Sequence, residues 1–292
     1  MRIAKVGLTS ACLAYYYGTF SLLKALLLSS TNNKITLDVI EKYTQYGHGL
    51  ATITSNKDIF PLAEKIMVLN NGFLTQFLRA NGYDVSRIEV SKRYSSMEGV
   101  NESDMNKIFN VKDMIARVPE LKGIYIELFQ EHPEYITFNC SSYHDIQNVE
   151  ISFPLYKNSK YLTHEKIREI LGWPSTIAFT SDEKIIKTEK MQNRSLIENK
   201  KLYESTMSDD CYVRPLLGID DVLLFNFIIL YSLSIWVRYR PALWRDICEG
   251  DLDLYRPLFT NFLISVERIV PNMVLDRIYQ KHFLFAGFPY LA

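Results

Sequence analysis

The most constraining feature of the sequence is a strongly apolar stretch from Val222 to Val237, near the C-terminal end. The stretch is shorter than the roughly 20 residues needed to span a bilayer, and it contains Asn226, Ser232 and Ser234. A helix that is apolar on all sides must be covered on all sides. The stretch therefore predicts a helix buried at the centre of a folded core, and we expect no membrane partner.

A second apolar stretch lies at the N-terminus, where Leu13 to Leu28 repeats apolar residues at spacings of three and four. Arg2 and Lys5 precede it as in a secretory signal, but tyrosines and Lys24 interrupt it and no clean cleavage site follows. We expect a retained amphipathic helix. Since neither apolar helix can bury its surface alone, the two are predicted to pack against each other.

Other helices are predicted from periodicity and end signals. They are Thr36 to Gln45, Asp58 to Ala80, Val111 to Val118, Leu254 to Ile269 and Asn272 to Leu284. Pro271 is expected to separate the last two, since proline disfavours a helix interior. The polar segment 84–108 is expected to be a loop.

The middle of the chain has a different character, with short runs rich in Ile, Tyr, Phe, Val and Thr between turn-like clusters. Strands are predicted at Ile124 to Phe129, Tyr135 to Cys140, Val149 to Tyr156, Ser175 to Thr180 and Lys184 to Glu189. A small helix, Thr163 to Leu171, is expected with Thr163 as its N-cap. We expect at least three of these strands to pair antiparallel.

These elements predict an α+β fold in three segments of the chain. Residues 1–118 and 216–292 are expected to form one mainly α-helical bundle, and residues 119–215 a mixed, mainly β insertion. Insertions carried on a rigid scaffold often hold binding residues. The insertion is therefore a candidate surface for a protein partner.

Charge and cysteine content narrow the classes of function. The 33 Lys and Arg balance 33 Asp and Glu, so no global field attracts nucleic acid, and any RNA contact needs a local patch. The 4 cysteines are scattered without a CxxC pair, which favours reduced thiols in the cytoplasm over disulfides or zinc. The histidines form no metal-ligand pair, and no nucleotide or acyl-transfer motif is present. We expect no metal and no cofactor.

His48 stands between Gly47 and Gly49 and is one candidate site residue. The sequence around it could be half of an oxyanion loop, although no nucleophile elbow accompanies it. The alternative is a tight turn in which the glycines supply the backbone geometry and His48 bonds to backbone.

A denser group of cations and aromatic residues lies just after the long apolar stretch. Its members are Arg238, Tyr239, Arg240, Trp244 and Arg245. Such a group can stack bases and bind phosphates, which makes it a candidate nucleic-acid site. The alternative is that the rings cap the core and the arginines are solvated or pair with Asp246 and Glu249.

Several short strings of the sequence together resemble the bacterial YaaC-like proteins. They are Tyr15-Tyr16-Tyr17-Gly18, Leu22-Leu23-Lys24-Ala25-Leu26, Gly47-His48-Gly49-Leu50, Arg238-Tyr239-Arg240-Pro241 with Trp244, and Pro271 before an apolar helix. The two ends of the chain are also similar to the HEPN superfamily of helical bundles. In that superfamily an Arg-x(4 to 6)-His pair marks the members that cleave RNA. The matching pair here is Arg277 and His282, and the alternative is a helix end with both side chains solvated.

The resemblance implies two hypotheses from different classes. The first is a metal-independent endoribonuclease or RNA-binding protein of stress or phage defence, with Arg277 holding phosphate charge and His282 moving a proton. The second is a non-catalytic module that dimerises and holds a partner protein through its insertion. A homodimer is expected in both.

Overall fold

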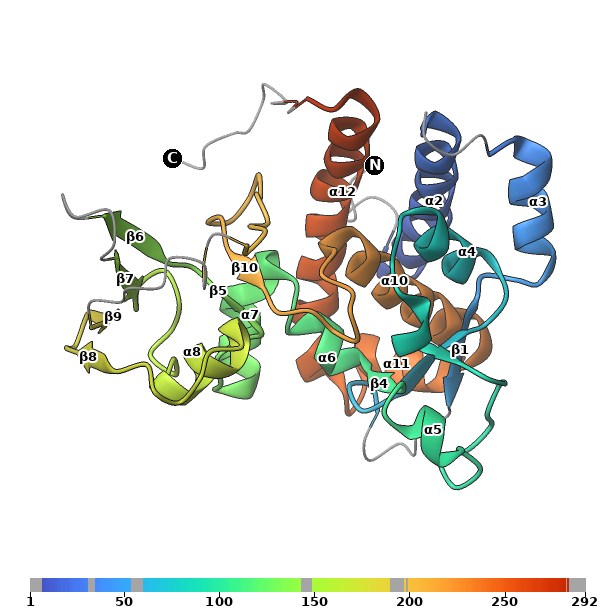
Figure 1. The fold of residues 1–292 in the computed structure, drawn as a ribbon. Helices are drawn as coiled ribbons and strands as arrows, with labels where there is room; N and C mark the ends of the chain where they lie inside the picture. The colour runs from blue at the N-terminus through green and yellow to red at the C-terminus, as the bar shows by residue number, and fades with distance from the viewer. Residues whose placement is uncertain are drawn as a thin grey trace. The chain divides into compact units, whose positions relative to one another are not determined.

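The chain is mixed α+β and about 50% helical, with 10 α-helices in the part of the chain that the structure describes (Figure 1). The structure is a computed structural model that describes residues 7–30, 35–53, 60–142, 149–189, 197, 199–281 and 283. The chain divides into two compact units. Unit 1 comprises Met1–Val111, Asn226–Leu254 and Leu263–Ala292, and unit 2 comprises Lys112–Phe225 and Tyr255–Phe262.

Unit 1 is built on two long apolar helices, α2 (Leu8–Ser29) and α10 (Val222–Tyr239). They contact through stacked rings, with the Tyr16 and Phe227 centroids 5.8 Å apart and those of Phe20 and Phe227 6.1 Å apart. The predicted packing of the two apolar helices is confirmed. The helix α3 (Leu37–Gln45), predicted from its periodicity, follows α2 in the chain.

Helix α10 is covered nearly all round: most of its residues from Val222 to Trp236 are buried. By length and composition alone, α2, α10 and the segment Asp253–Tyr279 could each cross a membrane, but 78% of the apolar window of α10 is buried inside the protein. At its N-terminus the Asp221 carboxylate accepts a hydrogen bond of 2.9 Å from the backbone N–H of Leu223, as expected for a helix cap.

A small sheet in unit 1 replaces part of a predicted helix. Its strands are β1 (Leu50–Ile53), β2 (Lys65–Leu69), β3 (Glu89–Val90) and β4 (Phe109–Asn110). β2 pairs antiparallel with β1 and β4 and parallel with β3. The helix predicted over 58–80 is therefore wrong over 60–72, and α4 (Phe73–Ala80) is its helical part, while residues 58 and 59 lie outside the described residues. A short continuous apolar run such as 66–69 suits a buried strand as well as a buried helix.

The segment 84–108 is more ordered than the predicted loop. It contains a 3₁₀ turn, η2 (Val85–Arg87), the strand β3 and the short helix α5 (Glu102–Met105). Polar residues favour a loop by composition, but here the buried carboxylate of Asp104 organises them through hydrogen bonds to Ser91 and Tyr94.

Unit 2 opens with three short helical segments. They are α6 (Val111–Ile115), η3 (Pro119–Leu121) and α7 (Lys122–Phe129). The strand predicted over 124–129 is wrong, because the 3₁₀ turn begun by Pro119 runs directly into α7. β-branched and aromatic residues indicate a strand only weakly when tertiary contacts favour a helix.

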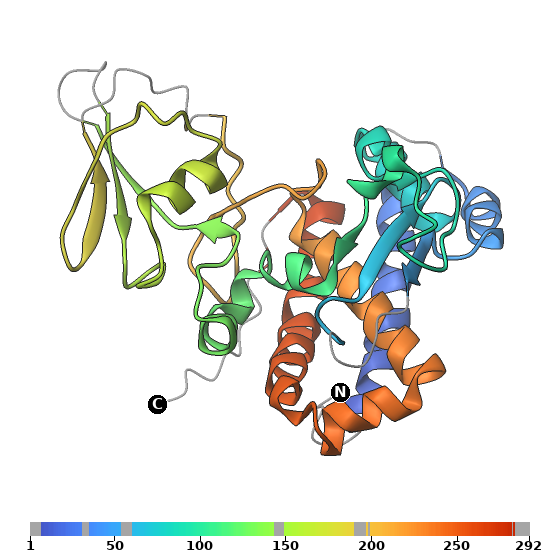
Figure 2. The same cartoon turned by 90° about the horizontal axis from the view of Figure 1, so that it is seen from below.

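The strands predicted over 135–140 and 175–180 have other bounds in the structure, but the prediction of at least three antiparallel strands in the insertion is confirmed by four strands that pair in one sheet. They are β6 (Asn139–Ser142), β7 (Val149–Pro154), β8 (Phe179–Ser181) and β9 (Ile185–Thr188), in the order β6-β7-β9-β8. Helix α8 (His164–Leu171) lies beside this sheet (Figure 2), and Ile167, Ile170 and Leu171 share one apolar core with β7. Thr163 caps α8 as predicted. A separate pair joins β5 (Tyr135–Ile136) to β10 (Tyr212–Val213).

The C-terminal helices differ from the prediction at Pro271. After α11 (Pro241–Glu249) and η4 (Asp253–Tyr255), one continuous helix, α12, runs over Arg256–Tyr279 with Pro271 inside it. The predicted break between two helices is therefore wrong. Proline removes one backbone donor but does not forbid a helix whose apolar residues are otherwise buried.

Candidate functional site

The loop that carries His48 is clamped by close backbone contacts within unit 1. Gly47 and Gly49 have φ angles of 82° and 77°, in the left-handed region that favours glycine. The carbonyls of Gly47 and His48 accept hydrogen bonds of 3.1 and 3.0 Å from the backbone N–H groups of Phe73 and Leu74. A Cβ added to Gly72 would lie 2.5 Å from the backbone nitrogen of Gly49. The loop is therefore held rigidly against the start of α4.

This clamp presents the His48 ring to a group of aromatic side chains, Tyr16, Phe20 and Tyr231, which together with His48 we call the ring cluster. The ring centroids of Tyr16, Phe20 and Tyr231 lie 5.4, 4.9 and 6.3 Å from that of His48. Tyr16 and Phe20 share one face of α2 because they are four residues apart. Tyr231 is fixed from α10 by a hydrogen bond of 2.8 Å from its hydroxyl to the carbonyl of Leu50.

Two polar atoms of the ring cluster are buried and have no hydrogen-bond partner in the described part of the chain. They are the Tyr16 hydroxyl and Nδ1 of His48. Burial, reinforced by the charges of Arg238 and Lys24, lowers the pKa of His48, so its ring is neutral at pH 7. Burial also raises the pKa of Tyr16 and keeps its phenol protonated. A neutral histidine can accept a proton, which suits general-base chemistry.

Three cations act on the ring cluster electrostatically: Lys24 and Arg238 on His48, and Arg93 on Tyr231. Lys24 lies one helical turn beyond Phe20, with its ammonium 4.3 Å from the Phe20 ring centroid. Arg238 donates hydrogen bonds to the Tyr17 hydroxyl at 3.1 Å and to the carbonyl of Ser234 at 3.0 Å. Tyr16, Phe20 and Tyr231 are buried, whereas Tyr17 and Tyr239, against which Arg238 lies, are exposed. Cations beside exposed rings can hold a phosphate and stack a base.

The residues predicted as a nucleic-acid site lie at the end of α10 and at the start of α11, and they have separate surroundings. Arg238 joins the ring cluster, and its guanidinium lies 5.1 Å from the ring centroid of Tyr239, a residue that is 68% exposed. Arg240 pairs at 2.7 Å with the fully buried carboxylate of Glu64. Trp244 is buried and donates to the Thr9 hydroxyl at 2.8 Å, while Arg245 is exposed on α11.

Of the predicted catalytic pair, Arg277 and His282, the structure describes only Arg277. Arg277 lies in the last turn of α12 and is partly buried. His282 lies outside the described residues. The expected pairing of these two side chains therefore stays a prediction.

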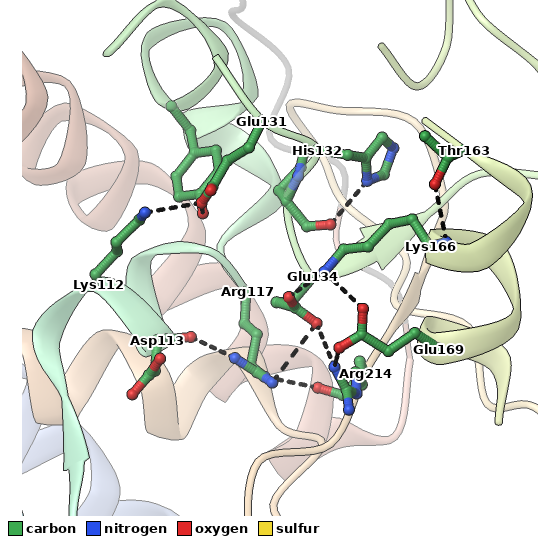
Figure 3. A network of polar contacts seen from close by, with 12 residues as sticks. Lys112, Asp113, Arg117, Glu131, His132, Glu134, Thr163, Lys166, Glu169 and Arg214 are labelled. Atoms are coloured by element: carbon green, nitrogen blue, oxygen red, sulfur yellow. Dashed lines mark hydrogen bonds and ion pairs between the residues drawn. The ribbon is translucent and has the colours of Figure 1, made fainter. Parts of the chain in front are cut away.

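Unit 2 contains a network of charges around Glu134 (Figure 3). The Glu134 carboxylate binds the Lys166 ammonium, and it lies 3.0 and 3.9 Å from the guanidinium groups of Arg214 and Arg117. Although burial raises the pKa of Glu134, these cations hold it below its usual range. Arg117 also donates to the carbonyls of Asp113 and Arg214 at 2.6 and 2.9 Å. Glu169 also pairs with Lys166 and Arg214, so carboxylates and cations alternate through the network, whose geometry is typical of a structural cross-link.

His132 lies next to this network and differs from His48. Its Nδ1 is 2.8 Å from the carbonyl oxygen of Pro133, and burial lowers the pKa of His132 to about 4. No cluster of three or more His, Cys, Asp or Glu side chains that could hold a metal ion occurs among the described residues.

Comparison with known proteins supplies a family for the whole chain. The family model for YaaC-like proteins matches residues 2–278. The chain belongs to the YaaC-like family. No curated protein and no solved structure matches it significantly. The strings that suggested a YaaC-like protein include the parts of the site, Tyr16 and Tyr17, His48, and Arg238, which the fold brings together.

The sequence alone did not indicate the whole site. Tyr231 and Arg93 stood in no motif, and Tyr231 was hidden inside the apolar stretch that forms α10. The available signal was the Tyr231 hydroxyl in an otherwise apolar helix. A buried tyrosine needs a polar partner for its hydroxyl, so its position indicated a contact with another element. Lys24 carried a clearer signal, a cation eight residues after Tyr16 on the same face of α2.

Proposed function

We propose that this YaaC-like chain binds single-stranded RNA at the ring cluster and cleaves it without a metal ion. The observation that carries the proposal is a neutral, partly exposed histidine in unit 1 whose pKa the charges of Arg238 and Lys24 help to lower, with Arg238 also lying against the rings of Tyr17 and Tyr239. Lys24 and Arg238 would hold a phosphate, and Tyr17 and Tyr239, which are 47% and 68% exposed, would stack bases.

The chemistry of the proposal is a transfer within the RNA strand. His48 accepts the proton of a ribose 2′-hydroxyl, the 2′ oxygen attacks the neighbouring phosphorus, and the bond to the 5′ oxygen breaks. Water returns a proton to that leaving oxygen. The products are a 2′,3′-cyclic phosphate end and a 5′-hydroxyl end. Arg238 stabilises the charge that builds on the phosphate.

The resemblance of the two ends of the sequence to HEPN proteins extends the proposal. In this extended form N- and C-terminal helices make a HEPN-like bundle, the protein is a cytoplasmic homodimer, and the RNA is cleaved in stress or phage defence. Arg277 and His282 are then a second catalytic candidate, with the roles that the superfamily resemblance implies.

One assay tests binding and cleavage together. Fluorescein-labelled single-stranded RNA of mixed sequence is incubated with the protein in EDTA, and anisotropy and denaturing gels are read in parallel. Lys24→Gln should weaken binding about tenfold, a free-energy loss of about 1.4 kcal/mol, while Lys42→Gln on the exposed face of α3 should not change it. His48→Gln should abolish cleavage and leave binding within about threefold of wild type.

The same assay separates the two catalytic candidates. Cleavage that survives His48→Gln but not His282→Ala assigns the chemistry to Arg277 and His282. Wild-type protein that neither binds nor cleaves RNA contradicts the proposal altogether.

A second candidate function is a non-catalytic, dimerising module that holds a partner protein through the insertion. It is favoured by the strand order β6-β7-β9-β8, in which β8 is an outer strand with Thr180 and Ser181 exposed. Outer strands offer backbone groups to which an extended segment of a partner can add. A protein that forms dimers by light scattering but shows no RNA binding supports this candidate over the first.

A further inference from the structure

A pocket of about 230 Å³ lies wholly within unit 2, and its lining contains none of the residues named as site candidates above. Its walls come from η3, the start of α7, the turn after β7 and the loop before β10. Its charged and hydroxyl-bearing lining includes Glu120, Lys122, Lys157, Ser208 and Asp209. The volume is below the roughly 300–1,000 Å³ of sites for drug-sized ligands, so the pocket suits a smaller molecule.

Glu120 is the most unusual group in this pocket. Its Oε1 accepts two hydrogen bonds, from the Tyr203 hydroxyl at 2.7 Å and the Ser205 hydroxyl at 2.6 Å. Its Oε2 is buried and has no partner in the described part of the chain, and the same holds for the hydroxyl oxygen of Ser208. A buried carboxylate oxygen without a partner is costly, so it marks a place where a donor belongs.

The opposite charge is available in the same pocket. The ammonium of Lys122 donates to the carbonyl of Lys157 at 2.5 Å, which leaves two of its three N–H groups for another acceptor. The ammonium of Lys157 lies 3.3 Å from the Asp209 carboxylate and is therefore already paired with an anion. Lys122 is thus the cation of the pocket that can receive an anionic group.

We infer that this pocket binds a small zwitterion of the amino-acid class, with its ammonium on Glu120 and Ser208 and its carboxylate on Lys122. A simple anion would leave Oε2 of Glu120 without a donor, and a simple amine would leave two N–H groups of Lys122 without an acceptor. A zwitterion serves both groups at once. Burial raises the pKa of Glu120 and lowers the pKa of Lys122. Both shifts are expected for charged groups that are removed from water, and a bound ligand of opposite charges would offset them.

The inference is tested by isothermal titration calorimetry of the full-length protein against the free proteinogenic amino acids. At least one should bind with a dissociation constant below about 1 mM, comparable to other small-metabolite sites. The matching amine without the carboxylate, and the matching acid without the ammonium, should each bind at least tenfold more weakly. If the wild-type protein binds none of the amino acids at about 10 mM, the pocket is filled by water alone and the inference fails.

Variants locate the binding site. Glu120→Gln and Lys122→Met should each weaken binding at least tenfold, while the exposed pair Glu183→Gln and Lys184→Met in the same unit should leave it unchanged. Circular dichroism checks that each variant is folded. If Glu120→Gln unfolds the protein, Ser208→Ala provides the second test, with a loss of about threefold or more. Binding that all three pocket variants leave unaltered overturns the assignment.

The proposals of RNA binding and of amino-acid binding can be rejected independently, because the two sites use different residues in different units. Lys122→Met should not change RNA affinity, and Lys24→Gln should not change amino-acid affinity.

Discussion

Asp104 on α5 is a buried carboxylate, 2% exposed, that accepts hydrogen bonds from Ser91 and Tyr94 and pairs with Lys107. Burial raises the pKa of Asp104, but these donors outweigh it and lower the pKa to about 2. Because the folded pKa lies below the unfolded value, the stabilisation is present above about pH 4 and is lost as pH falls toward 2.

Asp104→Asn should therefore lower the free energy of unfolding by about 1–3 kcal/mol at pH 7. The difference from wild type should shrink as pH falls from 4 to 2. Urea denaturation at several pH values measures both effects. Glu102→Gln, an exposed change on the same helix, is the control and should shift stability by less than about 0.5 kcal/mol. A pH-independent loss for Asp104→Asn would mean that shape, not charge, carries the effect.

Glu64 and Arg240 form a buried ion pair in unit 1, and the Trp236 indole donates to the same carboxylate at 2.9 Å. Removing one charge leaves the other without its partner, so Glu64→Gln and Arg240→Met should each cost about 3–5 kcal/mol. The double variant should cost less than the sum of the two, because the charges then disappear together. A double-mutant cycle measured by urea denaturation decides this, and strict additivity would show that the two residues act separately.

At the scale of elements, the sequence predicts α2 and α3 from their apolar periods, α8 from its N-cap signal, and α10 from a continuous apolar run. Thr163 caps α8 as predicted, and in the structure Asp221 caps α10. The segments 65–69 and 122–129 were misassigned because a short apolar run suits a strand or a helix equally, and the choice depends on pairing partners that are distant in sequence.

Pro271 inside α12 is the element-scale feature that sequence rules most clearly misjudged. Proline cannot donate the backbone hydrogen bond that an interior residue makes, and its ring crowds the preceding turn. Pro271→Ala should therefore raise the free energy of unfolding, by up to about 3 kcal/mol, in chemical denaturation. Pro257→Ala, in the first turn of the same helix, is the matched control and should have little effect. A destabilised Pro271→Ala variant would show that the surrounding packing depends on the ring.

At the scale of the whole molecule, the balanced charge of 33 basic and 33 acidic residues limits how RNA affinity responds to salt. If Lys24 and Arg238 neutralise about two phosphates, the logarithm of the association constant should fall with the logarithm of salt concentration with a slope of about −1.4. Anisotropy titrations between 50 and 300 mM salt measure the slope, and Lys24→Gln should reduce its magnitude by about 0.7. A slope steeper than about −4 would require a basic surface that the ring cluster does not supply.

The sequence predicted the mixed α+β class and the family but not the assembly of the site. Tyr16, His48 and Arg238 stood in three separate strings, and each string had a structural explanation by itself. What unites them is the contact of α2 with α10 and the backbone clamp at Gly47 to Gly49, which are tertiary features. The pocket at Glu120 had no sequence signal. A glutamate after a proline is common in sequences, and only the structure shows that its second carboxylate oxygen is buried without a partner.

The contact between Gly49 and Gly72 has a consequence for protein engineering. Any side chain at Gly72 would collide with backbone, which cannot move aside as a flexible side chain can. In a library that randomises the loop and the start of α4, both positions should therefore return glycine whatever activity is selected. Attempts to redirect this site should leave the two glycines in place and vary the rings and cations that surround His48.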